Sequence, residues 1–365
     1  MSERLTVTYH LDVEAADAEA RAEQICREQT VEVPAVVVRD AFFADEVKGR
    51  VERIEEAEAG GQLAVLSYPV AATASDPAQL LNVIFGNSSL CADVRCVDVE
   101  LPAALCVALE GPRFGAAGVR ERVGAVDRAL TCTAIKPMGL STEALAELCG
   151  TFARAGIDVI KDDHGLAGQP WSAFEARVTA CLGETRAAAD ASGREALYVP
   201  NLIGTPQRVL RGLAFAQEAG ARAVMVSPML VGLPFFWELV HRHADVPVLA
   251  HPAFGGAVRI DPVALFGRLW RAYGADAVIF VSFGSRFSAG REACRVLAER
   301  LSAPCNGLLS ALPVPAGGIR LENVAEAAAF YGRESMLLVG GDLQVEPGAI
   351  FERARRFVDI VATVS

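Results

Sequence analysis

The sequence has 365 residues, of which 52% are hydrophobic, and it carries a formal net charge of −11 at pH 7. This length and composition provide for a large core and favour two domains. An acidic surface repels nucleic-acid phosphates and anionic lipid, which argues against nucleic-acid binding and membrane-surface roles. The sequence shows neither the apolar core of a signal peptide nor an apolar run of the ~20 residues that a membrane helix needs, so we expect a cytoplasmic protein.

Residues 1–125 mix strand and helix patterns. Strand-like alternation or β-branched runs occupy residues 4–13, 35–43, 62–70 and 94–102, and helical periodicity occupies residues 15–30 and 77–87. The resulting order, strand-helix-strand-strand-helix-strand, predicts a ferredoxin-like α+β domain with an antiparallel sheet.

Residues 126–365 alternate short apolar runs with longer amphipathic stretches. The apolar runs lie at residues 130–136, 157–161, 196–202, 222–228, 246–252, 276–282, 312–318 and 335–341. Helical patterns that end at glycine separate several of them, at residues 141–156, 205–220 and 261–274. Eight strands with helices between them predict a (β/α)₈ TIM barrel. A doubly wound open sheet is the alternative, but it requires a glycine-rich phosphate turn after its first strand, and "IKPMGLS" is not one.

The nine cysteines are an odd number and form no C-x-x-C pair. Most of them stand within apolar runs. We therefore expect free, buried thiols in a reducing compartment.

Polar residues or glycines stand at the end of every predicted barrel strand, and in a barrel these ends share one mouth where the chemistry takes place. Gly317 and Gly318 follow the seventh strand, and Gly340 and Gly341 follow the eighth. Glycine lets backbone amides approach an anion closely. These pairs predict a phosphate site, and therefore a small phosphorylated substrate.

The second strand ends in "KDDH", which places charge at the end of a buried run. Lys161 and Asp163 share a face because strand residues alternate. They could form a simple ion pair. Alternatively, an uncharged Lys161 could take up CO₂ as a carbamate and, with Asp163 and His164, bind a hard metal such as Mg²⁺. A lysine beside such a metal loses its proton more readily, which would suit Lys136 to act as a general base.

Two stretches, "TAIKPMGLS" and "AGIDVIKDDHGLAGQP", resemble the large subunit of ribulose-bisphosphate carboxylase (RuBisCO), whose pattern is I-K-P-K-x-G-L-S followed by G-x-D-x-x-K-D-D-E. Further similar stretches extend over nearly the whole chain: "EGPRFGAAGVRERVG", "LYVPNLIGTPQRVLRGLAFAQEAG", "LAHPAFGG", "LPVPAGGI" and "LLVGGD". The resemblance implies the fold expected above, an N-terminal α+β domain followed by a barrel.

The resemblance also implies residue roles. Lys161 stands where the family carries its carbamylated lysine, Asp163 where it carries a metal ligand, and Lys136 where it carries the enolising base. His251 matches a histidine near the C3 hydroxyl of the substrate. Glu28 and Asn82 match residues that reach the active site of a partner subunit, which implies a homodimer with shared sites.

Departures from the family pattern bear on the reaction. The third metal ligand, a glutamate in the family, is His164 here, and the second lysine of I-K-P-K is missing. Arg286 is an imperfect substitute for the lysine of the mobile loop. Pro252 replaces an arginine and Ala316 a serine. Losing both lysines of the carboxylation steps while keeping Lys136 implies enolisation without CO₂ fixation, as in RuBisCO-like (form IV) proteins.

We therefore expect an isomerase or enolase-type enzyme acting on a phosphorylated ketose such as 5-methylthioribulose 1-phosphate. The alternative is a decarboxylase, transcarboxylase or hydrolase of a branched 3-oxo-acid sugar phosphate, such as 3-oxo-isoapionate 4-phosphate. An inactive scaffold is a third hypothesis, against which the surviving lysines and glycine pairs argue. The role of His164 stays open: it could ligate the metal and favour a softer ion, it could turn away, or Lys161 could remain a plain cation without a carbamate.

Overall fold

The structure is a computed structural model that describes residues 3–34, 42–287 and 290–364. By its contacts the chain divides into two compact units. The first unit comprises Met1–Gly111, Gly255–Tyr273 and Pro304–Leu308. The second unit comprises Pro112–Phe254, Gly274–Ala303 and Leu309–Ser365. The division of the chain into domains at residue 125 remains a prediction.

The first unit is built on a four-stranded antiparallel sheet of order β2-β3-β1-β4. Its strands and helices are β1 (Arg4–Leu11), α1 (Ala18–Glu28), β2 (Arg50–Glu56), β3 (Gln62–Pro69), α2 (Pro77–Phe85), β4 (Val94–Glu100), α3 (Ala103–Leu109) and α10 (Pro262–Ala264). Alternate residues of β1 are buried, as the sequence pattern predicts. This strand order confirms the ferredoxin-like prediction. The strand predicted at residues 35–43 lies largely outside the described residues, and β2 was not predicted.

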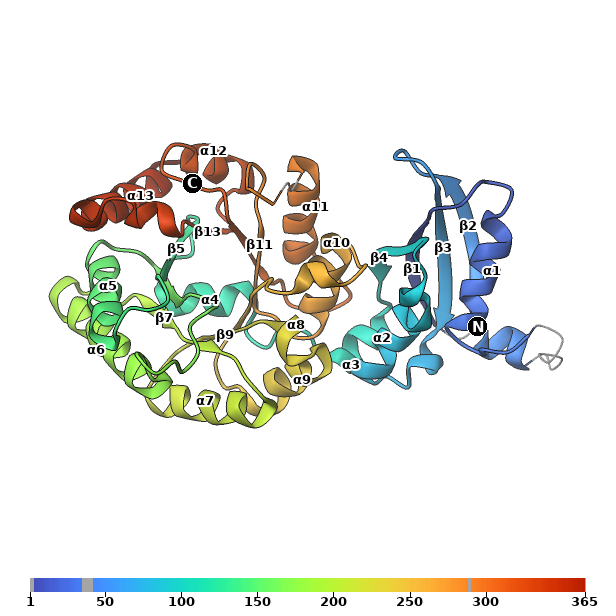
Figure 1. Cartoon of the computed structure of the whole chain (residues 1–365), viewed down its shortest axis with the longest axis horizontal. Coiled ribbons are helices and arrows are strands. Elements are labelled where there is room, and N and C mark those ends of the chain that lie inside the picture. The colour runs from blue at the N-terminus through green and yellow to red at the C-terminus, as the bar shows by residue number, and fades with distance from the viewer. Residues whose placement is uncertain (1–2, 35–41, 288–289, 365) are drawn as a thin grey trace. The chain divides into compact units, whose positions relative to one another are not determined.

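The second unit is a parallel barrel ringed by helices (Figure 1). Its strands hydrogen-bond in the order β7-β6-β5-β13-β12-β11-β10-β9-β8, and β7 and β8 are consecutive segments separated by Pro200. Counting β7 and β8 as one interrupted strand, the barrel has eight strands, which confirms the TIM-barrel prediction. The strands are β5 (Leu130–Ile135), β6 (Val159–Asp162), β7 (Leu197–Val199), β8 (Asn201–Leu202), β9 (Val224–Val226), β10 (Val248–Ala250), β11 (Ala277–Val281), β12 (Leu312–Ala316) and β13 (Met336–Leu338).

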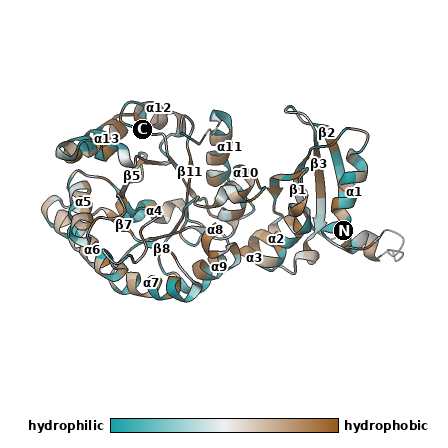
Figure 2. Ribbon diagram, viewed as in Figure 1, coloured by the Kyte–Doolittle hydropathy of each residue, from teal (hydrophilic) through white to brown (hydrophobic). Residues whose placement is uncertain are grey.

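Helices cover the outside of the barrel, and most of them carry both hydrophobic and hydrophilic residues (Figure 2). They are α5 (Thr142–Arg154), α6 (Phe174–Ser192), α7 (Pro206–Glu218), α8 (Pro228–Val231), α9 (Leu233–Glu238), α11 (Arg291–Ser302), α12 (Val324–Tyr331) and α13 (Ile350–Val364). Another helix, α4 (Gly115–Val123), packs against the barrel interior. Val119 and Val123 of α4 belong to one hydrophobic cluster with inward residues of the strands, such as Leu130 and Val314. The barrel interior is thus a packed core.

All nine cysteines lie within the described residues and are free, and seven of them are buried, which confirms the expectation of buried thiols. Burial raises the pKa of Cys26 and of Cys132 to about 12. These thiols therefore stay protonated and pack as small apolar groups. In the described part of the chain, no helix combines the length and the apolarity that crossing a membrane would require.

A buried ion pair supports the strand that carries the site. Asp162, at the end of β6, is fully buried and accepts hydrogen bonds from the Tyr198 hydroxyl at 2.7 Å and the Asn201 N–H at 3.0 Å. The guanidinium of Arg177, also fully buried, lies 3.1 Å from Asp162 Oδ2, the oxygen that accepts from Asn201. The first aspartate of "KDDH" is thus a structural residue that joins β6 to α6 and β8.

Replacing Arg177 by methionine should lower the free energy of unfolding by about 3–5 kcal/mol, because it leaves the Asp162 carboxylate buried without its counter-charge. Thermal unfolding followed by circular dichroism measures the effect. The matched control is Arg154→Met, since Arg154 and Glu184 form a partly exposed pair at 3.6 Å whose loss should change stability by less than about 1 kcal/mol. Equal effects from both substitutions would contradict a special role for Arg177.

Candidate active site

The candidate site lies at the carboxyl ends of the barrel strands. Lys136 directly follows β5, and Asp163 directly follows the neighbouring β6. The two strands pair in register, with Ile135 opposite Asp162, and the Asp163 N–H donates to the Ile135 carbonyl at 3.3 Å. This register brings side chains from two strand ends to the same level of the mouth.

Asp163 is the centre of a small charged cluster. Its Oδ2 lies 3.3 Å from Lys136 Nζ, and its Oδ1 lies 3.4 Å from His164 Nδ1. Burial alone would raise the pKa of the Asp163 carboxyl, but the Lys136 charge and the Gly165 N–H, 3.1 Å away, outweigh it and hold that pKa below its usual value. The carboxylate is therefore ionised at neutral pH. The ion pair considered for Lys161 is formed by Lys136 instead.

Two imidazoles meet across the mouth. The rings of His164 and His251 stack with centroids 4.5 Å apart and planes inclined by 13°. Burial lowers the pKa of His164, and it lowers the pKa of His251 well below its usual range, with the charge of Lys161 acting in the same direction. Both rings are thus neutral at pH 7. The Ala253 N–H donates to His251 Nδ1 at 3.1 Å, which leaves the proton of that ring on Nε2.

Lys161 is buried at the end of β6, with 3% of its surface exposed. Its Nζ donates to the Asp162 carbonyl oxygen at 3.0 Å. Burial lowers the pKa of this amine, and the charge of Lys136 also acts to lower it. A buried amine with a lowered pKa is the chemical form that reacts with CO₂, since only the neutral amine is nucleophilic.

The glycine pairs follow β12 and β13, and Gly340 lies beside Lys136. A Cβ atom placed on Gly340 would come within 3.4 Å of Lys136 Nζ, so the backbone after β13 approaches the lysine closely. Gly317 and Gly318 have φ angles of +71° and +135°, and a Cβ on Gly318 would meet the Ser285 backbone at 2.8 Å. Gly341 begins the turn after β13. Arg286 is exposed in the loop after β11, where its guanidinium lies 4.8 Å from the Phe287 ring.

Asn201 is a residue whose role the sequence analysis missed. It is 1% exposed, and its Nδ2 donates to the carbonyls of His164 and Leu166, both at 3.0 Å. Two carbonyl partners fix the orientation of the amide, because a flipped amide would face oxygen to oxygen. The loop that carries His164 is thereby tied to β8. The only sequence signal was a polar residue at a strand end, which other strands share.

The donor set for a metal is incomplete without Lys161. In the described residues, no group of three or more His, Cys, Asp or Glu side chains could hold a metal ion. Asp163 and His164 supply a carboxylate oxygen and a neutral imidazole nitrogen. A carbamate on Lys161 would supply a third ligand, so the residues fit a divalent metal only if that carbamate forms.

The remaining predicted residues belong to the first unit. Glu28, the last residue of α1, accepts a hydrogen bond from Asn87 Nδ2 at 3.1 Å and lines a hollow between α1 and the Asn87–Leu90 turn. Asn82 is exposed on α2 and donates to Gln79 at 3.3 Å. The contribution of Glu28 and Asn82 to a partner's site remains a prediction.

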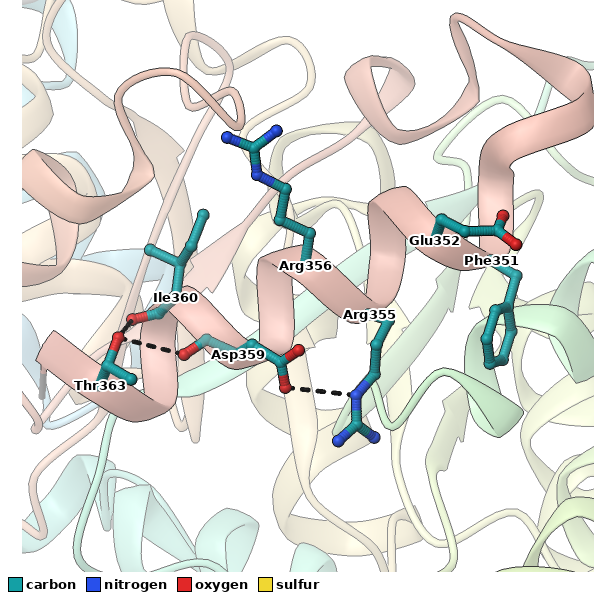
Figure 3. Close-up of a pocket in the computed structure, with 7 residues that line it drawn as sticks. All are labelled: Phe351, Glu352, Arg355, Arg356, Asp359, Ile360 and Thr363. Atoms are coloured by element: carbon teal, nitrogen blue, oxygen red, sulfur yellow. Dashed lines mark hydrogen bonds and ion pairs between the residues drawn. The ribbon is translucent and has the colours of Figure 1, made fainter.

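A hollow on the outer face of α13 offers no comparable chemistry (Figure 3). Two of its charged groups are paired along the helix, with Arg355 Nε 3.2 Å from Asp359 Oδ1, and the Thr363 hydroxyl donates to the Asp359 carbonyl at 3.2 Å. None of the candidate site residues lines it.

The fold and the site together define the class: a ferredoxin-like domain followed in the chain by a barrel of the RuBisCO type. The family model "Ribulose bisphosphate carboxylase large chain, catalytic domain" matches residues 115–259. The chain is 43% identical over 363 residues to ribulose bisphosphate carboxylase-like protein 1 of Rhodopseudomonas palustris, and the alignment covers 100% of this chain and 99% of the relative. It is 39% identical over 363 residues to 5-methylthioribulose-1-phosphate isomerase of Rhodospirillum rubrum, with 99% and 97% covered.

Among solved structures, a Rubisco-like protein from Rhodopseudomonas palustris matches with a TM-score of 0.90 at 42% identity, over 99% of this chain and 98% of that one. The chain belongs to the RuBisCO superfamily, in its branch of RuBisCO-like proteins.

Proposed function

We propose that this protein enolises and isomerises a phosphorylated ketose, with 5-methylthioribulose 1-phosphate as the leading candidate substrate, and that it does not fix CO₂. The observation that carries the proposal is the cluster at the mouth, in which Lys136, Asp163 and the stacked His164–His251 pair adjoin the glycine turns. The isomerase name of the Rhodospirillum rubrum relative supports the same reaction class.

The proposed reaction needs only proton movement. Lys136, which pairs with Asp163 as an ammonium group, must first lose its proton to act as the base. Its Nζ then takes the proton from the carbon next to the carbonyl, and the C–H electron pair becomes the C=C bond of an enediolate. The Nε2–H of neutral His251 donates a hydrogen bond to the oxygen on which negative charge develops. The hydroxyl proton on the deprotonated carbon passes to the former carbonyl oxygen, and return of the first proton to the former carbonyl carbon gives the isomeric sugar phosphate. Atoms and electrons balance without an oxidant or a reductant.

A divalent metal such as Mg²⁺ fits this scheme. Asp163, His164 and a carbamate on Lys161 would hold it, and when bound it would stabilise negative charge on the substrate oxygens as a Lewis acid. The glycine turns after β12 and β13 would hold the phosphate through backbone N–H groups. Arg286 would add a cation from the loop after β11.

Deuterium exchange tests the proposal. In D₂O with Mg²⁺ and bicarbonate, 5-methylthioribulose 1-phosphate should acquire deuterium next to its carbonyl and give an isomer, as read by proton NMR. Ribulose 1,5-bisphosphate with ¹⁴CO₂ should give no labelled three-carbon acid, because both lysines of the carboxylation steps are missing from this sequence. Release of CO₂ from a branched 3-oxo-acid phosphate, without exchange on the ketose, would favour the lyase alternative instead.

We also propose that two copies form a homodimer with shared sites, since Glu28 and Asn82 match residues that complete a partner's site in the family. Mixing Glu28→Gln chains with Lys136→Met chains should restore activity, because one hybrid site then carries both native residues. Co-refolding in equal amounts should recover about a quarter of wild-type activity, the statistical share of intact sites. Recovery of no activity from dimers shown to be mixed would contradict sharing.

A further inference from the structure

The rim of the barrel mouth is apolar. Large apolar side chains stand 45–64% exposed in the segments between barrel strands and the helices that follow them, or at the start of those helices: Met138 after β5, Trp171 after β6, Leu230 in α8 after β9, Phe254 after β10 and Phe287 after β11. The fold gives no reason for these exposures, because none of the five side chains is needed to fill the core. Apolar side chains gathered around a site mark a surface that a ligand covers.

Of these five residues, Phe254 combines the greatest exposure with a backbone conformation that is unfavourable for a bulky residue. It is 64% exposed, and its φ angle is +65°, in the left-handed region that bulky residues avoid. The backbone strain is therefore not offset by burial of the ring. Strain of this kind persists where function maintains it. Phe254 stands three residues after His251, and the Ala253 N–H between them bonds to the His251 ring at 3.1 Å.

The order of the strands in the barrel determines which part of a bound substrate lies near Phe254. The glycine turns follow β12 and β13. On one side, β13 is next to β5, the strand before Lys136. On the other side, β12 is followed by β11 and then by β10, the strand before His251. A ketose whose phosphate occupies the glycine turns, and whose reacting carbons lie between Lys136 and His251, directs its far end toward the loop after β10. In that loop, Pro252, Ala253 and Phe254 carry no charge.

We propose that Phe254 is a specificity-determining residue that packs against an apolar substituent, such as an alkylthio group, on the substrate end remote from the phosphate. This inference rests on the proposed function, whose substrate class it narrows to ketose monophosphates with an apolar terminus. A bisphosphate would place its second anion against an aromatic ring in a segment, residues 252–254, that carries no charge of its own, and this contact would disfavour it.

The test measures binding separately from catalysis. Ribitol 1-phosphate and its 5-methylthio derivative lack a carbonyl, so neither can be enolised. Calorimetry with Mg²⁺ and bicarbonate should show the methylthio compound binding about 10-fold more tightly to the wild-type protein, the discrimination typical of a small apolar group. In Phe254→Gly the two affinities should become equal within about 3-fold. The control Phe254→Leu, which keeps an apolar side chain, should retain most of the preference.

The glycine variant also separates specificity from structure. Glycine accepts a φ of +65° without strain, so Phe254→Gly should unfold at the same temperature as the wild type or a higher one. A lower unfolding temperature together with an unchanged affinity ratio would overturn the proposal, since Phe254 would then serve the fold. A fall in the sedimentation mass of Phe254→Gly would also overturn it, by assigning the ring to contact with a second copy.

Failure of the proposed function would look different. A wild-type protein that prefers the methylthio analogue but exchanges no deuterium on the ketose would disprove the isomerase and leave the Phe254 inference intact. Exchange on the ketose with no preference between the two analogues would support the isomerase and disprove the role of Phe254.

Discussion

Lys136→Met should abolish deuterium exchange on the ketose phosphate, with a loss in turnover on the order of 10³–10⁴-fold, while substrate affinity changes little. A general base acts in the transition state, whereas the phosphate is held by the glycine turns. Lys136 Nζ is placed for this role beside Asp163 and close to Gly340. Single-turnover exchange and calorimetry with the inert phosphate analogue measure the two quantities.

The composition of the chain sharpens this experiment. Of 34 lysines and arginines only three are lysine: Lys48, Lys136 and Lys161. The surface cations are thus almost all arginine, and two of the three amines stand at the barrel mouth. Arginine cannot shed its proton near neutral pH, so a retained lysine points to a need for a neutral amine. Lys48→Met, which removes an ion pair with Glu23 at 2.7 Å, is the matched control and should keep normal turnover.

Near-normal turnover in Lys136→Met would mean that another group is the base. A variant that has lost analogue binding as well would show that Lys136 serves to hold the site together. Chemical rescue separates the cases further. Alkylating a Lys136→Cys variant with 2-bromoethylamine restores an amine at nearly the original place, and exchange should recover if that amine is the base.

The barrel could be predicted because its strands are buried on both faces. Such strands read as continuous apolar runs, and glycine ends the helices between several of them. Strand β2 escaped detection for the opposite reason. Five of the seven residues in Arg50–Glu56 are charged, as suits the exposed edge of the first unit's sheet, and the apolar alternation is too weak to see.

The site was predictable as a set of residues but not as a set of contacts. Strand alternation correctly separates Asp162, which faces Arg177, from the mouth. It could not show that Asp163 pairs with Lys136, since that depends on the register between β5 and β6. Asn201 and Phe254 were missed because their roles also depend on the three-dimensional structure. Asn201 bonds to the loop that carries His164, and Phe254 is distinguished by its φ angle.

Lys161 should make metal binding depend on dissolved CO₂. The donor set at the mouth supports this expectation, because Asp163 and His164 alone leave the metal with two protein ligands. Lys161 is buried, and its Nζ bonds to a backbone carbonyl, so a carbamate would replace a poorly solvated amine with an oxygen ligand. A metal that binds the carbamate traps it, so CO₂ and metal should bind cooperatively.

Manganese binding, followed by electron paramagnetic resonance in CO₂-depleted buffer with and without bicarbonate, tests this dependence without any substrate. Apparent metal affinity should fall at least about 10-fold on CO₂ depletion, which corresponds to a coupling free energy of about 1.4 kcal/mol.

With ¹³C-bicarbonate and Mg²⁺, the wild type and Lys48→Arg should each show one carbamate resonance, and Lys161→Ala should show none. Three lysines in the whole chain keep that assignment simple. If depletion changes neither metal affinity nor activity while Lys161→Ala is inactive, Lys161 works as a plain amine. His164 would then stand in place of glutamate because the site has no need of a cage of three oxygen ligands.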